Sequence, residues 1–136
     1  MNAITAYYAA EAKGAGIRFT AKLNVSQNVV ISDYELCSVV GNILDNALAA
    51  AKEVNDESSK ILFAADTKAN GDLYIVISNP YSGAIRKNNN SFASTKKGGH
   101  GIGLESVKAI VSKNNGYCNF RFDSKVFYSE IMLRQD

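Results

Sequence analysis

The sequence predicts an α/β fold, a two-layer sandwich in which a mixed, mostly antiparallel sheet carries helices on one face. Residues 34–54 repeat apolar side chains with the period of a helix. Residues 17–25 alternate apolar and polar side chains, and residues 60–66 and 73–78 are short apolar runs, as in strands. With the segments around them, these runs give the order strand, helix, strand, strand, polar segment, helix, strand, strand.

The chain should open with a helix followed by a half-exposed strand. Residues 2–13 are rich in alanine and favour a helix, which we expect Gly14 and Gly16 to end. Residues 17–25 then alternate, so one set of side chains should face the core. The inward set is Ile17, Phe19, Ala21, Leu23 and Val25.

The predicted helix of residues 34–54 has an apolar side and a polar side. Asp33 or Ser32 is suited to be its N-cap. Asn42 and Asn46 are four residues apart, so their amides project from the same side, one turn apart. The apolar side comprises Leu36, Val39, Val40, Ile43, Leu44, Ala47, Ala50, Ala51 and Val54. The polar side comprises Asn42, Asp45, Asn46 and Ala49.

The next two strands should form a hairpin. The Asn-Gly pair at 70–71 predicts a tight turn between residues 60–66 and residues 73–78. The second run is almost continuously apolar and β-branched, so it should occupy the centre of the sheet. We expect Asn79 and Pro80 to end that strand.

Residues 81–100 contain no convincing helix or strand pattern. Their charged residues are all cations, namely Arg86, Lys87, Lys96 and Lys97. Residues 101–115 predict a helix with Leu104, Val107, Ile110 and Val111 as its apolar stripe, and Gly116 should stop it. Residues 117–122 and 126–133 then predict a closing hairpin.

Length and composition restrict the possible functions. A chain of 136 residues is one domain by size, and we expect an N-terminal helix in residues 1–16 followed by one domain in residues 17–136. The net charge of +2, without a basic stripe, argues against a nucleic-acid partner. No apolar run approaches the ~20 residues that span a bilayer. Cys37 and Cys118 are expected to be buried free thiols.

Three features of the sequence suit a phosphate ligand when taken together. The run GGHGIGL at 98–104 opens a predicted helix, whose first N–H groups attract an anion. The cations of residues 81–100 suit a triphosphate, and the amide oxygens of Asn42 and Asn46 suit Mg²⁺, which usually combines few protein ligands with substrate phosphates. Each feature alone has a structural alternative: an ordinary tight turn, a solvated loop or a surface helix.

In order and spacing, three short motifs resemble those of the ATP-binding superfamily that contains gyrase, heat-shock chaperones, histidine kinases and mismatch-repair proteins. They are N-I-L-D-N-A at 42–47, N-P-Y-S-G at 79–83 and H-G-I-G-L at 100–104. Within that superfamily the chain is similar to the catalytic ATP-binding domain of sensor histidine kinases, in the branch of peptide quorum-sensing kinases. The resemblance covers residues 17–134 and implies ATP and Mg²⁺ as cofactors.

The resemblance implies roles for both asparagines of the central helix. Asn46 matches the asparagine that ligates Mg²⁺ in the family. Asn42, which also lies at the nucleotide, occupies the catalytic position where hydrolytic members hold a glutamate base. Because an amide cannot accept a proton at neutral pH, water activation should be poor, which favours a kinase over an ATPase.

The adenine motif departs from the family pattern at two positions. Gly83 matches its second glycine, but Asn79 replaces the adenine-reading aspartate and Tyr81 replaces the first glycine. An asparagine amide can turn either its oxygen or its NH₂ toward a base, so Asn79 predicts weak ATP binding and modest discrimination against GTP.

The glycine-rich motif corresponds to the phosphate-binding box of the family. Its matching positions, with the side chains placed to reach phosphate, are Lys97, Gly99, His100, Gly101, Gly103 and Leu104. His100 is the only histidine and lies inside this box, so we do not expect it to be a phosphoacceptor. We expect the acceptor histidine and the dimerisation helices to precede Met1 in a longer parent, and residues 1–16 to continue from the last of those helices.

The implied function is transfer of the γ-phosphate of ATP to a histidine on a separate dimerisation domain, with a response regulator downstream. The parent is expected to be a homodimer that is anchored in the membrane and holds this domain in the cytoplasm. Two alternatives stay open at this point: a degenerate module that binds nucleotide or docks partners without kinase activity, and a serine kinase of the anti-sigma type.

Overall fold

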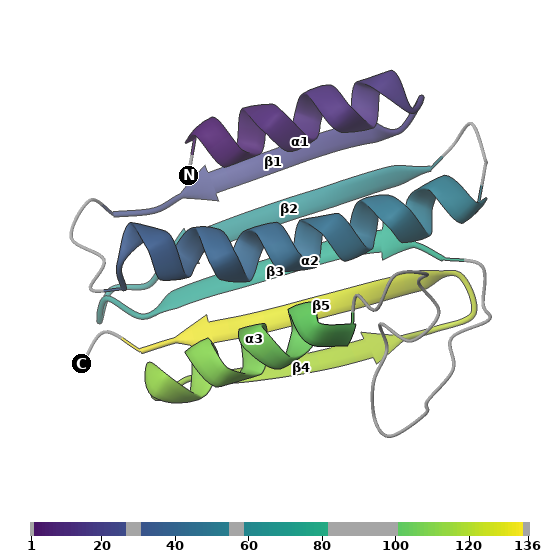
Figure 1. Ribbon diagram of the computed structural model, residues 1–136. Coiled ribbons are helices and arrows are strands. Elements are labelled where there is room, and N and C mark those ends of the chain that lie inside the picture. The colour runs from purple at the N-terminus through teal and green to yellow at the C-terminus, as the bar shows by residue number, and fades with distance from the viewer. Residues whose placement is uncertain (1, 27–30, 55–58, 82–100, 135–136) are drawn as a thin grey trace.

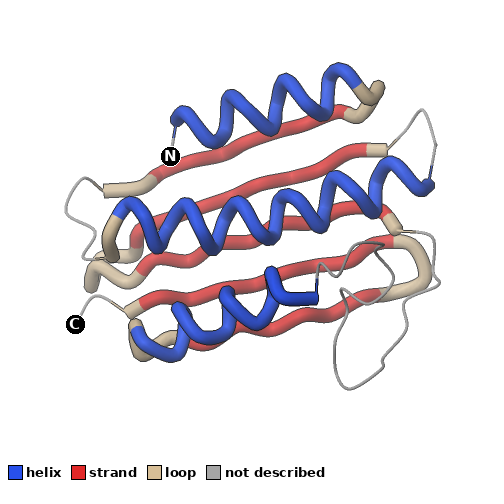
Figure 2. Tube along the Cα trace, viewed as in Figure 1, coloured by secondary structure: helices blue, strands red, loops and turns tan. Residues whose placement is uncertain are grey.

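The computed structural model describes residues 2–26, 31–54, 59–81 and 101–134. The elements in these ranges are α1 (Asn2–Gly14), β1 (Arg18–Asn24), α2 (Asp33–Val54), β2 (Lys60–Thr67), β3 (Leu73–Pro80), α3 (Gly101–Lys113), β4 (Tyr117–Phe122) and β5 (Val126–Leu133). The strands form one sheet, and the helices cover one of its faces (Figures 1 and 2). This arrangement confirms the predicted two-layer α/β sandwich.

The sheet has the strand order β1-β2-β3-β5-β4. β1 pairs with β2 in parallel, whereas the remaining neighbours are antiparallel, so the sheet is mixed as predicted. β3 occupies the centre, which confirms the expectation from its apolar composition.

The third strand is two residues longer than the predicted run of residues 73–78, and it ends at Pro80, so Asn79 and Pro80 lie at its end as expected. Pro80 lies opposite Val126 of β5. The pairing of β2 with β3 already ends at Ser78, opposite Leu62. On that side the missing N–H of Pro80 therefore costs no ladder hydrogen bond, which is the situation in which a strand tolerates proline.

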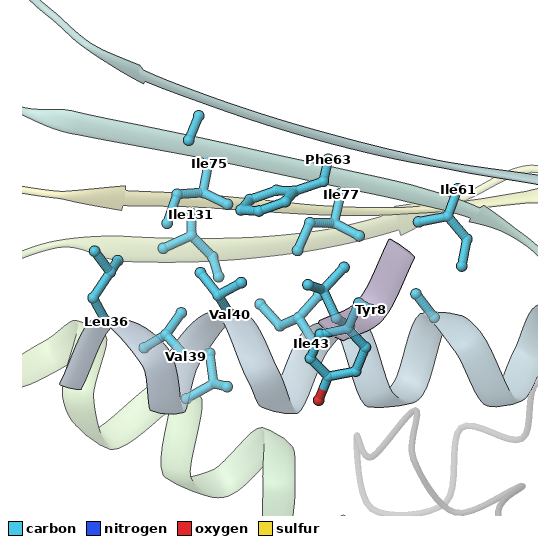
Figure 3. Close-up of a cluster of buried hydrophobic side chains, with 14 of the residues drawn as sticks. Tyr8, Leu36, Val39, Val40, Ile43, Ile61, Phe63, Ile75, Ile77 and Ile131 are labelled. Atoms are coloured by element: carbon cyan, nitrogen blue, oxygen red, sulfur yellow. The ribbon is translucent and has the colours of Figure 1, made fainter. Parts of the chain in front are cut away.

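α2 runs between α1 and α3 across the helix-covered face (Figure 1). Its apolar side packs on the sheet, and Figure 3 shows Val40 and Ile43 of α2 facing Ile75, Ile77 and Ile131 of the strands. The largest fully buried side chains are Phe63, Ile43, Leu44, Ile61, Leu73, Ile75, Ile77, Ile131, Val39, Val40 and Val107. The sides of α2 predicted as apolar and polar are thus confirmed.

Two helices end in the same hydrogen-bond motif, with different residues in the left-handed position. At the end of α1, Gly16 has φ 75° and Ile17 donates its N–H to the Ala12 carbonyl (2.9 Å). At the end of α3, Asn115 takes this role with φ 56°, and Gly116 donates to the Val111 carbonyl (2.9 Å).

Gly116 is therefore not the left-handed stop residue that the sequence predicted. Its hydrogen atom in place of a side chain serves packing instead, because a Cβ there would lie 1.9 Å from the Met132 carbonyl oxygen. The close approach of the α3–β4 connection to β5 is possible only for glycine.

The cysteine prediction is wrong for Cys37, which is exposed, whereas Cys118 is half-buried; both are free thiols. Cys37 lies one turn before Gly41, on the flank of α2 that α1 covers from Gly41 onward. Ala21, expected to face inward, is also exposed, since β1 is an edge strand. Among the described residues, no helix is long and apolar enough to cross a membrane.

Candidate functional site

The polar side of α2 places Asn42, Asp45 and Asn46 away from the sheet. Asn42 and Asn46 are half-buried, and Asp45 is exposed. Asn42 Nδ2 lies 3.5 Å from the Ser38 hydroxyl oxygen one turn earlier, at the limit of a hydrogen bond. Of the two predicted N-caps of α2, the structure selects Ser32, whose Oγ accepts the Glu35 N–H (3.1 Å).

Asn79 is buried near the end of β3, with 4% of its surface exposed. Strand alternation places it on the same face as Ile75 and Ile77, the face that the helices cover. Its Nδ2 donates to the Pro80 carbonyl oxygen (2.9 Å). This hydrogen bond holds the amide in one orientation, so the two orientations that the sequence left open are not equivalent here.

Tyr81, which replaces a glycine of the family motif, is held by the β4–β5 hairpin. Its backbone N–H donates to the Lys125 carbonyl (3.1 Å), and its hydroxyl donates to the Asp123 carbonyl. Its ring makes edge contacts with the rings of Phe122 and Phe127. Burial, and then the Asp123 charge, raise the pKa of Tyr81 above its ordinary value. Tyr81 is therefore a structural anchor that closes the end of β3 onto the hairpin.

α3 begins inside the glycine-rich motif. Gly101 and Gly103 lie in its first turn, and Leu104 is buried with 7% of its surface exposed. In Figure 1 the start of α3 and the C-terminal end of β3 lie toward the same side of the molecule. The N-terminal end of α3, which favours an anion, thus points to the end of the sheet that holds Asn79.

Asn42 and Asn46 lie on α2, Asn79 on β3 and Leu104 on α3, and α2 packs on both β3 and α3. Four predicted site residues, Gly83, Lys97, Gly99 and His100, lie outside the described residues, as do the cations of residues 82–100. The described residues contain no group of three or more His, Cys, Asp or Glu side chains that could hold a metal by itself.

Tyr8 on α1 contacts the polar side of α2, although it lies in none of the sequence motifs. Its hydroxyl donates to Asp45 Oδ1 (2.5 Å). In the sequence of α2, Asp45 stands between the two asparagines. Spacing gave only a weak signal: Tyr8 and Ala12 are four apart and buried, but the alanine-rich helix shows little amphipathic pattern. The contact depends on the packing of α1 beside α2, which local sequence does not encode.

Comparisons with known proteins agree on the fold. Residues 31–134 match the family model described as GHKL domain. The mycobacterial sensor histidine kinase MprB superposes with a TM-score of 0.74 at 20% identity, covering 98% of this chain and 94% of that chain. The Acinetobacter baumannii histidine kinase AdeS gives 0.74 at 14% identity, with 99% and 62% covered. The catalytic domain of histidine kinase ThkA gives 0.73 at 16% identity, with 99% and 92% covered.

No curated protein matches the sequence. The solved structures are distant in sequence, so they establish the shared fold, whereas the family model spans most of the chain. The motifs, the five-stranded mixed sheet and this match lead to one conclusion. The chain belongs to the GHKL family and has the fold of histidine kinase catalytic domains.

Proposed function

We propose that this chain is the ATP-binding catalytic domain of a two-component sensor histidine kinase. In this role it transfers the γ-phosphate of Mg-ATP to a histidine on a separate dimerisation domain. The observation that carries the proposal is the pairing of a GHKL fold with two amide side chains, Asn42 and Asn46, on the outer side of α2. α2 also packs on β3, which carries Asn79, and on α3, which begins in the glycine-rich motif.

The residues present fit Mg²⁺ that is bound chiefly through a nucleotide. The described residues hold no acidic cluster for a free divalent ion, and Asn46 offers one neutral amide oxygen. In the proposal Asn46 ligates the ion, which would neutralise charge on the triphosphate. Asn42 binds nucleotide at the position where hydrolytic members of the family hold a glutamate general base. Because an amide cannot accept the proton of water, Asn42 holds the reacting group without activating water.

Asn79 is proposed to read the adenine base. Because its Nδ2 donates to the Pro80 carbonyl, the amide oxygen is the end left for a ligand donor such as the exocyclic amino group of adenine. The orientation therefore supports ATP over GTP. Gly83, Lys97, Gly99, His100, Gly101, Gly103 and Leu104 are proposed to complete the nucleotide site.

The partners follow from the same proposal. They are a homodimeric, histidine-bearing dimerisation domain of the parent protein and a response regulator that receives the phosphoryl group. The sequence T-K-K-G-G-H-G-I-G-L at 95–104 supports membership of the peptide quorum-sensing branch. In that branch the domain lies in the cytoplasm and the parent is anchored in the membrane.

Transfer of radiolabel from γ-labelled ATP tests the proposal. The chain is incubated with the dimerisation domain of its parent and Mg²⁺, and a variant domain with its histidine replaced by alanine is the control. Label should appear only on the histidine-bearing domain, and the bond should be labile to acid but stable to alkali.

Two other results would contradict the proposal. Label that is stable to acid but lost in alkali would indicate a serine kinase. Tight binding of Mg-ATP, measured by calorimetry, without any transfer would indicate a nucleotide-binding module that lacks kinase activity.

A further inference from the structure

Tyr8 is a core residue whose polar end reaches the outer part of α2. Only 7% of its surface is exposed, and its ring lies with the buried side chains of the core (Figure 3). Its hydroxyl lies 2.5 Å from Asp45 Oδ1 and 3.2 Å from the Gly41 carbonyl oxygen. A hydroxyl has one proton, so Asp45 is the principal acceptor and the Gly41 carbonyl the weaker branch of a shared bond.

α1 packs against α2 at Gly41. A Cβ at this position would lie 3.5 Å from Ile4 Cδ1 and 3.8 Å from the Tyr8 hydroxyl, which are ordinary contact distances, so α1 lies next to this turn of α2. The turn of α2 from Gly41 to Asp45 therefore bears the contact with α1. That same turn contains Asn42 and is followed directly by Asn46.

In the pair of Tyr8 and Asp45, the tyrosine hydroxyl is the donor and the carboxylate is the acceptor. Burial, and then the hydrogen bond and charge of Asp45, raise the pKa of Tyr8 above its ordinary range. The phenol therefore remains a donor at neutral pH. A carboxylate that accepts such a bond is held toward α1, on the flank of α2 that lies away from α3.

We propose that Tyr8 is a positioning residue of the nucleotide site, which ties the Asp45 carboxylate to α1 and keeps its negative charge away from the phosphates bound beside Asn42 and Asn46. This inference rests on the proposed function, since it needs a triphosphate at that side of α2. Releasing Asp45 would leave a carboxylate free to turn toward the triphosphate, where like charges repel. A shift of α1 would have the same effect, so the position of α1 sets the affinity for nucleotide.

Tyr8→Phe tests the idea, because it keeps the ring in the core and removes only the hydroxyl. Tyr7→Phe is the matched control: Tyr7 is 58% exposed and touches the Tyr8 ring edge-on with centroids 4.9 Å apart. Binding of Mg-ATP and of adenosine is measured by calorimetry well below the unfolding temperature of each variant. Tyr8→Phe should weaken Mg-ATP about fivefold or more and leave adenosine unchanged, since adenosine has no phosphate.

A double variant separates positioning from simple destabilisation. Adding Asp45→Asn to Tyr8→Phe removes the repelling charge, so the affinity for Mg-ATP should return to within about twofold of the native value. Equal loss of adenosine and Mg-ATP binding, no loss in Tyr8→Phe, or no recovery in the double variant would each overturn the inference. A native chain that binds no Mg-ATP would instead refute the proposed function, and the inference with it.

Discussion

The inward and outward sides of α2 alternate along one helix yet serve different purposes. Ile43 is 2% exposed and Ala47 1% exposed, and both pack into the core. Their immediate neighbours, Asn42 and Asn46, are half-buried on the outer side. The helical period therefore separates the residues that hold the fold from those proposed to bind nucleotide, although they are adjacent in sequence.

This separation implies that a single substitution on α2 can change either the stability of the fold or the binding of the ligand without changing the other. A change on the inner side should lower the free energy of unfolding and leave the site of the folded protein intact. A change on the outer side should do the reverse. Four predictions test how complete the separation is.

The largest expected effect concerns Asn42. Without a general base the isolated domain should hydrolyse ATP about 10²–10⁴-fold more slowly than members that carry a glutamate. Steady-state phosphate release measures the rate. Release at the speed of an ordinary ATPase would show that another group activates water. Asn42→Glu should raise hydrolysis if the attacking water is already aligned.

Ile43→Ala tests the inner side of α2, which packs into the core. Removing a fully buried isoleucine should lower the free energy of unfolding by about 2–5 kcal/mol. Urea denaturation measures this loss, with Tyr34→Ala as the control, since Tyr34 on the same helix is 83% exposed. The folded fraction should bind Mg-ATP as the native chain does, and a large drop in its affinity would show that the two sides are coupled.

Asn46→Ala tests the outer side of α2, which is proposed to bind Mg²⁺ and nucleotide. Loss of the proposed metal ligand should weaken Mg²⁺-dependent ATP binding at least about tenfold, or about 1.4 kcal/mol. Circular dichroism and the unfolding temperature should remain close to native, since no core contact is removed. Unfolding of the variant would mean that Asn46 is structural and that the proposed metal site is misplaced.

The smallest effect is expected at Asn79, whose amide is held by the Pro80 carbonyl. The sequence alone predicted modest discrimination between ATP and GTP, but the fixed amide now predicts a clear preference for ATP. Asn79→Asp can only accept, so it should raise the ratio of ATP to GTP affinity by no more than about tenfold. Competition binding measures the ratio in both proteins. If GTP competes equally with the native chain, Asn79 does not contact the base.

Local patterns were sufficient to predict the elements and the layers. The helical period of α2 and the alternation in the strands depend on neighbours a few residues away, and the predicted core of α2 and the central place of β3 are confirmed. Predictions failed where the answer depends on distant packing. Cys37 is exposed although it lies one turn before Gly41, where α1 packs, and Gly116 is a glycine because β5 lies against it.

The candidate site was predictable to a smaller extent. Motif order singled out Asn42, Asn46 and Asn79, whose roles remain predictions, but the motifs do not show which contacts these side chains and their neighbours make. The hydrogen bonds of Asn79 to Pro80 and of Tyr8 to Asp45 depend on backbone geometry and on the docking of α1. The sequence also gave no reason to regard Tyr81 as an anchor of the β4–β5 hairpin.

The parallel pairing of β1 with β2 has consequences for the order in which the chain folds. β4 and β5 join through a short turn, whereas Arg18 meets Lys60 only after the chain has passed through all of α2. Closing that long loop costs entropy before any β1–β2 hydrogen bond forms, so β1 should join the sheet late. As an edge strand with one partner, β1 should also open first, together with the helix that carries Tyr8. Amide hydrogen exchange in α1 and β1 should therefore be faster than in β3 and β5.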